Sequence, residues 1–201
     1  YQCTRENNET NDIISNIKKT FTIPSNFVTK FCFFQNNLCF MMGNGTVGIC
    51  FEDKTRIVID PKEEFVQIYS NYNSLDDVID LDDSIELNED IQYKVSLVKR
   101  YAKSFKKYKQ LYELPRYNYL SSIPLYHITY FIKKDNSILF KLNNKNVQVA
   151  FNDHNNLIIF WNTKKMCFFK NIKDKCSLLD MNEVSRMNAN TDENKRFKKA
   201  K

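Results

Sequence analysis

Hydrophobic and polar residues alternate in several short runs of the chain, the pattern of half-buried β-strands. The apolar positions of the two clearest runs are Val47, Ile49, Phe51, Val147, Val149 and Phe151. Apolar runs from Phe65 to Tyr69 and from Met166 to Phe169 each predict a further strand. Asn44-Gly45 and Asn144-Lys145 are candidate hairpin turns. We expect about five or six short strands in each half of the chain.

The two halves are an internal repeat. The stretch from Thr46 to Asp53 recurs from Asn146 to Asp153 without a gap, and both copies share the order V-x-[IV]-x-F-x-D. The offset stays constant over about thirty positions, which chance matching of apolar residues does not explain. The repeat predicts two superposable antiparallel sheets, with Phe51 and Phe151 buried at equivalent positions.

Helical spacing appears after the first repeat. Five apolar residues fall on one face of a helix predicted over residues 91–111, and Pro115 ends the pattern. These residues are Ile91, Val95, Val98, Ala102 and Phe105. Lysines and Arg100 cover the opposite face. We also predict a short helix from Asp12 to Lys19 and a second helix from about Asn182 towards Lys199.

The linker from Ser74 to Asp90 carries eight acidic residues and no basic one. It is predicted to be a solvated acidic loop. The alternative is that it folds onto the basic face of the helix that follows, where exposed ion pairs stabilise little.

Composition agrees with a folded binding module. The chain has 201 residues, 42% of them hydrophobic, and includes 16 Phe and 11 Tyr, enough for a core without disulfides. The net charge of +6 permits an anionic partner without requiring nucleic acid. No apolar run is long enough to span a membrane. Tyr1 at the start predicts a cut point inside a longer protein.

Metal, cofactor and catalytic signatures are missing from the sequence. The six cysteines form no C-x-x-C pair and there are two histidines, so we expect no zinc site. Cys32, Cys39, Cys50 and Cys167 lie in apolar stretches and are expected to be buried free thiols, as in a reducing cytosol or nucleus. The three glycines cannot form a phosphate-binding loop, and no hydrolase, zinc protease or kinase motif is present. A hidden carboxylate pair stays open. We expect no enzyme activity, metal or cofactor for this chain.

Several segments of the sequence resemble a known family. The run I-P-S-N-F-V-T-K-F, residues 23–31, is similar to the start of the polo-box domain of polo-like kinases, where I-P-x-x-W-V-T-K-W is typical. Residues 47–57 resemble the first polo box, 94–101 the helix between the boxes, and 147–159 the second box. The segment 12–19 would cap the first box. The resemblance covers nearly the whole chain, in order.

The resemblance implies an α+β fold of two repeated polo boxes. Each box is a six-stranded antiparallel β-sheet with an α-helix, and the boxes pack as a β-sandwich-like pair. The expected divisions are an N-terminal cap segment and helix at 1–26, polo box 1 with the acidic linker and inter-box helix at 27–112, and polo box 2 with a C-terminal helix at 113–201.

The resemblance also implies a function. In the family this module binds phosphorylated Ser/Thr motifs of partner proteins, carries a mitotic serine/threonine kinase to spindle poles, kinetochores or the division site, and can restrain its own kinase domain in cis. It implies an ATP-dependent kinase domain before Tyr1, and a cytoplasmic and nuclear protein without a membrane partner.

The family's phosphopeptide site is matched only in part. The family holds phosphate with a His-x-Lys pair in the second box; His154 matches the histidine, but Asn156 replaces the lysine. Phe31 matches a tryptophan that packs on the peptide, and Lys109 and Gln110 match two leucines that line the site. His154 could equally be a solvent-facing turn residue, and Phe31 could be plain core.

Three hypotheses stay open. The first is a phosphopeptide-binding targeting module. The second is a phosphate-independent docking, autoinhibitory or dimerising module whose phosphate site is degenerate. The third and weakest is nucleic-acid binding through the basic stripe from Lys99 to Lys109, which would show steep salt dependence.

Overall fold

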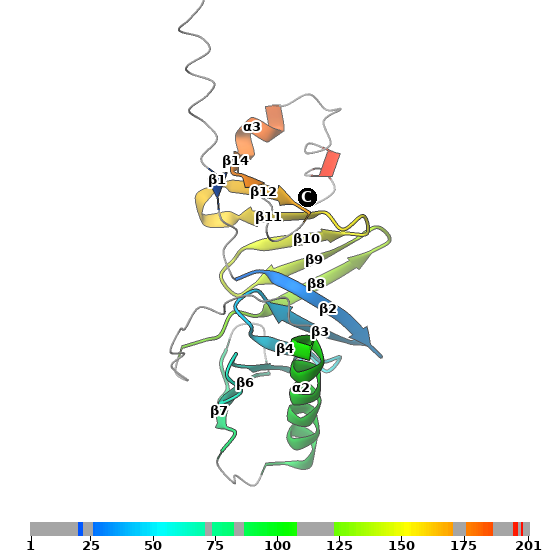
Figure 1. The fold of residues 1–201 in the computed structure, drawn as a ribbon, viewed down its shortest axis with the longest axis vertical. Helices are drawn as coiled ribbons and strands as arrows, with labels where there is room; N and C mark the ends of the chain where they lie inside the picture. Colours follow the sequence, from blue (N-terminus) through cyan, green and yellow to red (C-terminus); the bar gives the residue numbers. More distant parts are fainter. Residues whose placement is uncertain are drawn as a thin grey trace, which may run out of the picture.

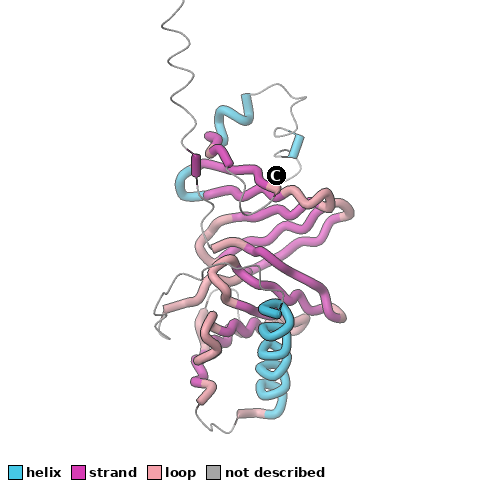
Figure 2. The backbone as a smooth tube through the Cα atoms, in the orientation of Figure 1, coloured by secondary structure: helices cyan, strands magenta, loops and turns pink. Residues whose placement is uncertain are grey.

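The structure is a computed structural model that describes residues 20–21, 26–70, 74–82, 87–107, 123–170, 176–186, 195, 196 and 198. Two six-stranded antiparallel sheets form its centre, with helix α2 over the outer face of the first sheet and α3 at the far end of the molecule (Figures 1 and 2). The predicted helix at 12–19 lies outside the described residues, as does most of the predicted C-terminal helix.

The first sheet is a meander in the order β2-β3-β4-β5-β6-β7. Its strands are β2 (Val28–Phe34), β3 (Asn37–Met42), β4 (Val47–Cys50), β5 (Arg56–Ile59), β6 (Phe65–Tyr69) and β7 (Asp77–Asp80). The prediction of a loop throughout the acidic linker is wrong at β7. Ile79 is buried there, beneath α2 (Glu89–Lys107), because β7 pairs with β6 and extends the sheet.

The second sheet repeats the meander in the order β8-β9-β10-β11-β12-β14. Its strands are β8 (Ile128–Lys134), β9 (Ser137–Leu142), β10 (Val147–Phe151), β11 (Asn156–Phe160), β12 (Lys165–Phe169) and β14 (Leu179–Asp180). A one-turn helix, η1 (Trp161–Thr163), joins β11 to β12. A separate ribbon pairs β1 (Thr20–Phe21) with β13 (Cys176–Ser177), and α3 (Met181–Arg186) follows β14.

The offset of 100 residues holds in the backbone itself. Val47 pairs with Ile59, and Val147 pairs with Ile159. Both first strands carry an irregularity at the same place, between Val28 and Lys30 in β2 and between Ile128 and Tyr130 in β8. The turns agree too, because Lys54 and His154 both have a left-handed backbone, with φ of 72° and 65°. The predicted repeat of two antiparallel sheets is confirmed.

One core lies between the two sheets and joins the repeats. Its fully buried members come from both halves: Leu38, Phe40, Met42, Val58, Ile128, Phe140 and Leu142. Phe27 packs edge-on against Phe169, with ring centroids 5.6 Å apart. His127 is its repeat mate, the residue 100 positions later, and packs against Tyr69 with ring centroids 4.2 Å apart. Each repeat therefore begins with a ring that packs on the last long strand of the other repeat.

Helix α2 covers the outer face of the first sheet. Val95, Val98 and Ala102 of α2 are buried on the first sheet as predicted, whereas Ile91 and Phe105 are only partly buried at the ends of the stripe. The prediction of buried free thiols is right for Cys39, Cys50 and Cys167 and wrong for Cys32, which is only half-buried.

The predicted burial of the two repeat phenylalanines is right for Phe51 and wrong for Phe151. Phe51 is 9% exposed beneath α2. Phe151 is only half-buried, because the side chain that stacks on it is a guanidinium, with Arg196 Cζ 5.0 Å from the ring centroid.

Gly48 packs closely against the ring of Phe40 in the inter-sheet core. A Cβ at this position would lie 2.5 Å from Phe40 Cζ, and Phe40 is fully buried. We expect Gly48→Ala to lower the free energy of unfolding by about 1–3 kcal/mol, because the ring must leave its packed position. Urea unfolding measures this change. An unchanged midpoint would show that Phe40 has room to move.

Candidate functional site

Two buried glutamines fix the repeats against each other. Gln148 on β10 accepts a hydrogen bond from Val28 N at 2.7 Å and donates to Val28 O at 2.9 Å. In the other direction, Gln67 on β6 donates to Ile123 O and accepts from Leu125 N. Each glutamine thus satisfies backbone groups of the other repeat, so β2 and the β10–β11 turn keep a fixed relation.

The β10–β11 turn presents His154 to solvent. Its ends are closed by hydrogen bonds from Phe151 N to Asn155 O and from His154 N to Phe151 O. Asp153 caps the turn by accepting from Asn155 N. His154 is exposed and takes the left-handed conformation. The turn therefore holds an imidazole at the tip of a fixed loop.

The carboxylate beside His154 already has a cationic partner. Arg196 donates to both oxygens of Asp153, at 3.2 Å and 2.6 Å. This pair holds the pKa of Asp153 well below its usual range. The negative charge next to His154 is thereby offset by the guanidinium, which favours an anion approaching the imidazole.

Asn156 connects the turn to the first repeat. Its Oδ1 accepts from Gln148 Nε2 at 3.1 Å, and its Nδ2 donates to His154 O at 3.4 Å. A chain of hydrogen bonds thus runs from Val28 through Gln148 and Asn156 to the backbone of His154. The structure brings these two predicted site residues together, and it engages the Asn156 amide inside the protein.

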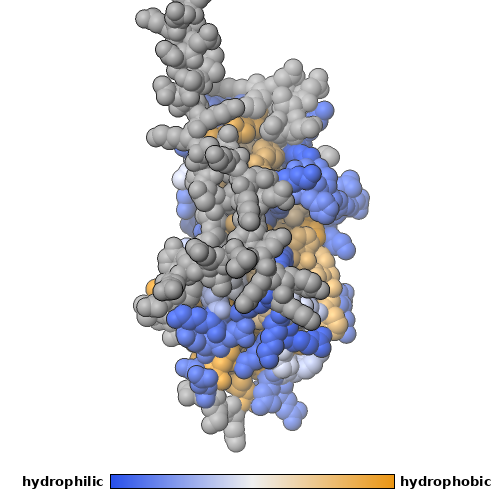
Figure 3. Space-filling view, in the orientation of Figure 1, coloured by the Kyte–Doolittle hydropathy of each residue, from blue (hydrophilic) through white to orange (hydrophobic). Residues whose placement is uncertain are grey.

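Phe31 lies on β2, three residues beyond this connection. Its ring is 37% exposed, and its buried part packs edge-on against Phe140 of the second repeat at 5.1 Å. Phe33, on the same strand, is 36% exposed. Figure 3 shows a hydrophobic patch at mid-height on the right-hand side, where β2 and β8 lie in Figure 1. Lys109 and Gln110 lie outside the described residues.

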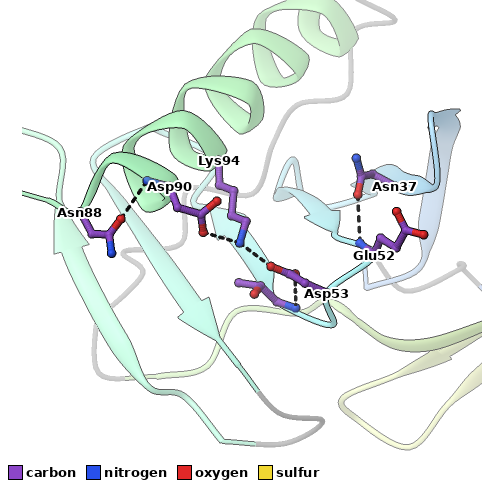
Figure 4. Close-up of polar contacts among 7 residues, drawn as sticks. Asn37, Glu52, Asp53, Asn88, Asp90 and Lys94 are labelled. Carbon is purple, nitrogen blue, oxygen red and sulfur yellow. Dashed lines mark hydrogen bonds and ion pairs between the residues drawn. The ribbon is translucent and has the colours of Figure 1, made fainter.

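The shared F-x-D motif has a structural role that the sequence analysis missed. Lys94 of α2 donates to Asp53 at 2.5 Å and to Asp90 at 2.6 Å (Figure 4). The Lys94 Nζ also lies 5.5 Å from the centroid of the Phe51 ring. Arg196 does the same at Asp153 and Phe151. In each repeat a cation from a later segment pairs with the turn aspartate and covers the phenylalanine. The feature of the sequence that pointed to this role is that both copies of the repeat carry Phe and Asp two residues apart.

Over the part of the chain that the structure describes, no group of His, Cys, Asp and Glu is arranged to hold a metal ion. Within the same residues, no helix is long and apolar enough to cross a membrane.

Comparisons with known proteins identify the family. The model of the POLO box duplicated region matches residues 36–95 and 134–197. No curated protein matches the sequence. Among solved structures, the polo-box domain of budding yeast Cdc5 bound to the Dbf4 polo-interacting region has a TM-score of 0.66 at 14% identity, over 96% of this chain and 77% of that one.

Two further structures of the same yeast domain agree. The Cdc5 polo-box domain bound to a Spc72 phosphopeptide has a TM-score of 0.65 at 15% identity, over 92% of this chain and 70% of that one. The domain on its own gives 0.63 at 15% identity, over 94% and 80%. At this sequence identity, the likeness to the Cdc5 structures shows the fold of this chain. The polo box itself is a non-catalytic module. The family match covers most of both repeats and more than half of the chain, so this chain belongs to the POLO box duplicated region family, and its two sheets are polo box 1 and polo box 2.

Proposed function

We propose that this chain is the phosphopeptide-binding targeting and regulatory module of a mitotic polo-like kinase. One observation carries the proposal: the exposed His154 is hydrogen-bonded through Asn156 and Gln148 to β2, the strand that carries the half-exposed ring of Phe31. The similar Cdc5 domain has been solved with a phosphopeptide of Spc72 and with the polo-interacting region of Dbf4, which supports a peptide as the ligand.

In this proposal each residue has a distinct task. A phosphorylated Ser or Thr carries nearly two negative charges and three acceptor oxygens. The His154 ring donates to the phosphate, while the Phe31 ring packs against the peptide. Lys109 and Gln110 line the same site. Asn156 supplies no charge, so the phosphate loses one charge-assisted contact relative to a His-x-Lys pair.

The wider role follows the same reasoning. A serine/threonine kinase domain preceding Tyr1 would be carried by this module to phosphorylated partners and restrained by it in cis. We propose the cytoplasm and nucleus, with spindle poles, kinetochores or the division site as destinations. The boundaries proposed for the three parts are 1–26, 27–112 and 113–201.

The second candidate is a docking module that does not require phosphate. The observation that favours it is the engagement of the Asn156 amide by Gln148 and by His154 O, which leaves His154 as the main donor of the turn. The same fold in Cdc5 has also been solved with the polo-interacting region of Dbf4.

A titration with matched peptides tests the proposal. A Ser-phosphoThr peptide should shift the amide NMR signals of residues 151–156, and its unphosphorylated twin should not. His154→Ala should abolish binding at this turn. Asn156→Lys should tighten it about tenfold, the equivalent of about 1.4 kcal/mol for one restored charged contact.

The control adds the same charge elsewhere. Asn162→Lys changes an exposed residue in η1, beyond the far end of β11, and should leave the affinity unchanged. If both peptides bind alike and neither His154→Ala nor Asn156→Lys matters, phosphate-independent docking replaces the proposal.

A further inference from the structure

A pocket of about 300 Å³ lies at the other junction between the boxes. It is formed where the β4–β5 turn of polo box 1 meets β8 of polo box 2. The lining residues that matter are Asn36, Glu52, Lys54, Arg56, Tyr130 and Phe131. None of them belongs to the site around His154.

The internal repeat relates this pocket to that site residue by residue. Lys54 is the repeat mate of His154, Arg56 of Asn156, and Phe131 of Phe31. The backbone agrees, because Lys54 and His154 share the left-handed conformation in equivalent turns. The pocket is therefore the equivalent, under the repeat, of the site around His154.

Hydrogen bonds join the two boxes at the wall of the pocket. Arg56 is 3% exposed, and its Nη1 donates to Thr129 O of β8 at 2.6 Å. The Cys50 thiol donates a hydrogen bond to Ile128 O at 3.7 Å. The guanidinium is thus fixed in the wall of the pocket rather than moving in solvent, which lowers the entropic cost of using it in binding.

The charges of the pocket suit an anion better than those of the His154 turn. Lys54 and Arg56 are two permanent cations two residues apart, where the other turn has a histidine and an asparagine. Glu52 also lines the pocket and opposes an anion, although its carboxylate accepts from Asn36 Nδ2 at 2.8 Å. The neighbouring Asp53 is paired with Lys94. The cations therefore outnumber the free carboxylates.

The strand beside the pocket is suited to an extended peptide. β8 lies at the edge of the second sheet, and β9 is its strand partner among the described residues. Its side chains Tyr130 and Ile132 are 46% and 37% exposed. An edge strand with exposed apolar side chains can receive a further strand, with side-chain contacts adding specificity.

We propose that this pocket is a second peptide site, in which Lys54 and Arg56 bind a phosphorylated Ser or Thr and Tyr130 and Phe131 contact the extended peptide. The site goes beyond the proposed function, which concerns the turn of His154. A chain with both sites could hold two phosphorylated motifs of one partner, which raises avidity without a new contact.

Calorimetry with a Ser-phosphoThr peptide tests the second site. Wild type should bind two peptides per chain, and the His154→Ala chain should bind one. In that chain, adding Lys54→Ala should weaken the remaining binding at least tenfold, Lys54→Arg should preserve it, and Glu52→Gln should tighten it. Lys145→Ala is the matched control, because Lys145 is an exposed turn lysine with φ of 68°.

The outcomes separate the two sites. If the His154→Ala chain binds no phosphopeptide, the second site is overturned and the proposed function stands. If Lys54→Ala removes all binding and His154→Ala removes none, the second site stands and the proposed function fails. Equal affinity for free inorganic phosphate, or for a peptide without phosphate, would overturn a phosphopeptide site.

Discussion

Phe140→Ala is expected to lower the free energy of unfolding by about 3–5 kcal/mol, the range for a fully buried phenylalanine. Phe140 is 0% exposed and lies in the core shared by both boxes. Its ring also supports Phe31 at 5.1 Å. The cavity would open between the sheets, where α2 and α3 cannot move in to fill it. Urea unfolding followed by circular dichroism measures the loss.

Phe33→Ala is the matched control. Phe33 is 36% exposed, so truncating the same side chain should cost well under half as much. Equal losses in the two variants would contradict the assignment of a shared core, because the ring buried between the boxes would then contribute no more to stability than the exposed ring.

The repeat was the part of the fold that could be read from the sequence. Alternation of apolar residues fixes which face of a strand is buried, and a slip of one residue would reverse it. The V-x-[IV]-x-F-x-D order therefore predicted the paired strands of both sheets. The polar turn residues after each copy then repeated the same left-handed position, at Lys54 and His154.

The contacts between the boxes could not be read in the same way. Gln148 stands between Val147 and Val149 as a polar residue in an alternating strand, which suggests an outward position. It is 1% exposed because the backbone of Val28 satisfies its amide, 120 residues away in sequence. A pairing of this length leaves no local pattern.

The wrong prediction at Phe151 has a similar origin. The motif placed both phenylalanines on the apolar face, but burial depends on what covers that face. A helix of 19 residues covers the first sheet at Phe51, whereas the Arg196 guanidinium is what stacks on Phe151. The apolar face predicted for the helix likewise did not show that Phe105, near the end of α2, would be only partly buried.

For the candidate site, the resemblance pointed to His154, Asn156 and Phe31, and the structure brings the first two together. The pocket at Lys54 and Arg56 was missed, although the offset of 100 residues already carried its signal. Applying the repeat to the site residues, and not only to the core, would have located it.

A buried histidine makes the protein sensitive to acid. His127 is 2% exposed, its Nδ1 bonds to Leu125 O at 2.8 Å, and its Nε2 has no hydrogen-bond partner among the described residues. Burial, with a smaller contribution from the Arg56 charge, lowers its pKa from 6.5 to about 4. The folded protein therefore keeps the ring neutral at pH values where the unfolded chain takes up a proton.

We expect this histidine to remove about 3 kcal/mol from the free energy of unfolding as the pH falls from 6.5 to about 4. The sign follows because the unfolded state binds more protons in this window, so stability is full above pH 6.5 and declines as the pH falls. Asp53 and Asp153 have lowered pKa values, so their contributions are lost only at more acidic pH. Urea unfolding between pH 7 and about 4.5 follows most of this loss before the carboxylates contribute.

His127→Phe should flatten this pH dependence, because it places at this position the residue type of its repeat mate Phe27, which packs on an aromatic ring in the same way. The variant loses the hydrogen bond to Leu125 O, so its stability at pH 7 should fall while its slope with pH disappears. His154→Ala removes the other, exposed histidine and should keep the wild-type slope. If His127→Phe and wild type lose stability in parallel as the pH falls, the acid sensitivity comes from carboxylates, and the buried ring is not its source.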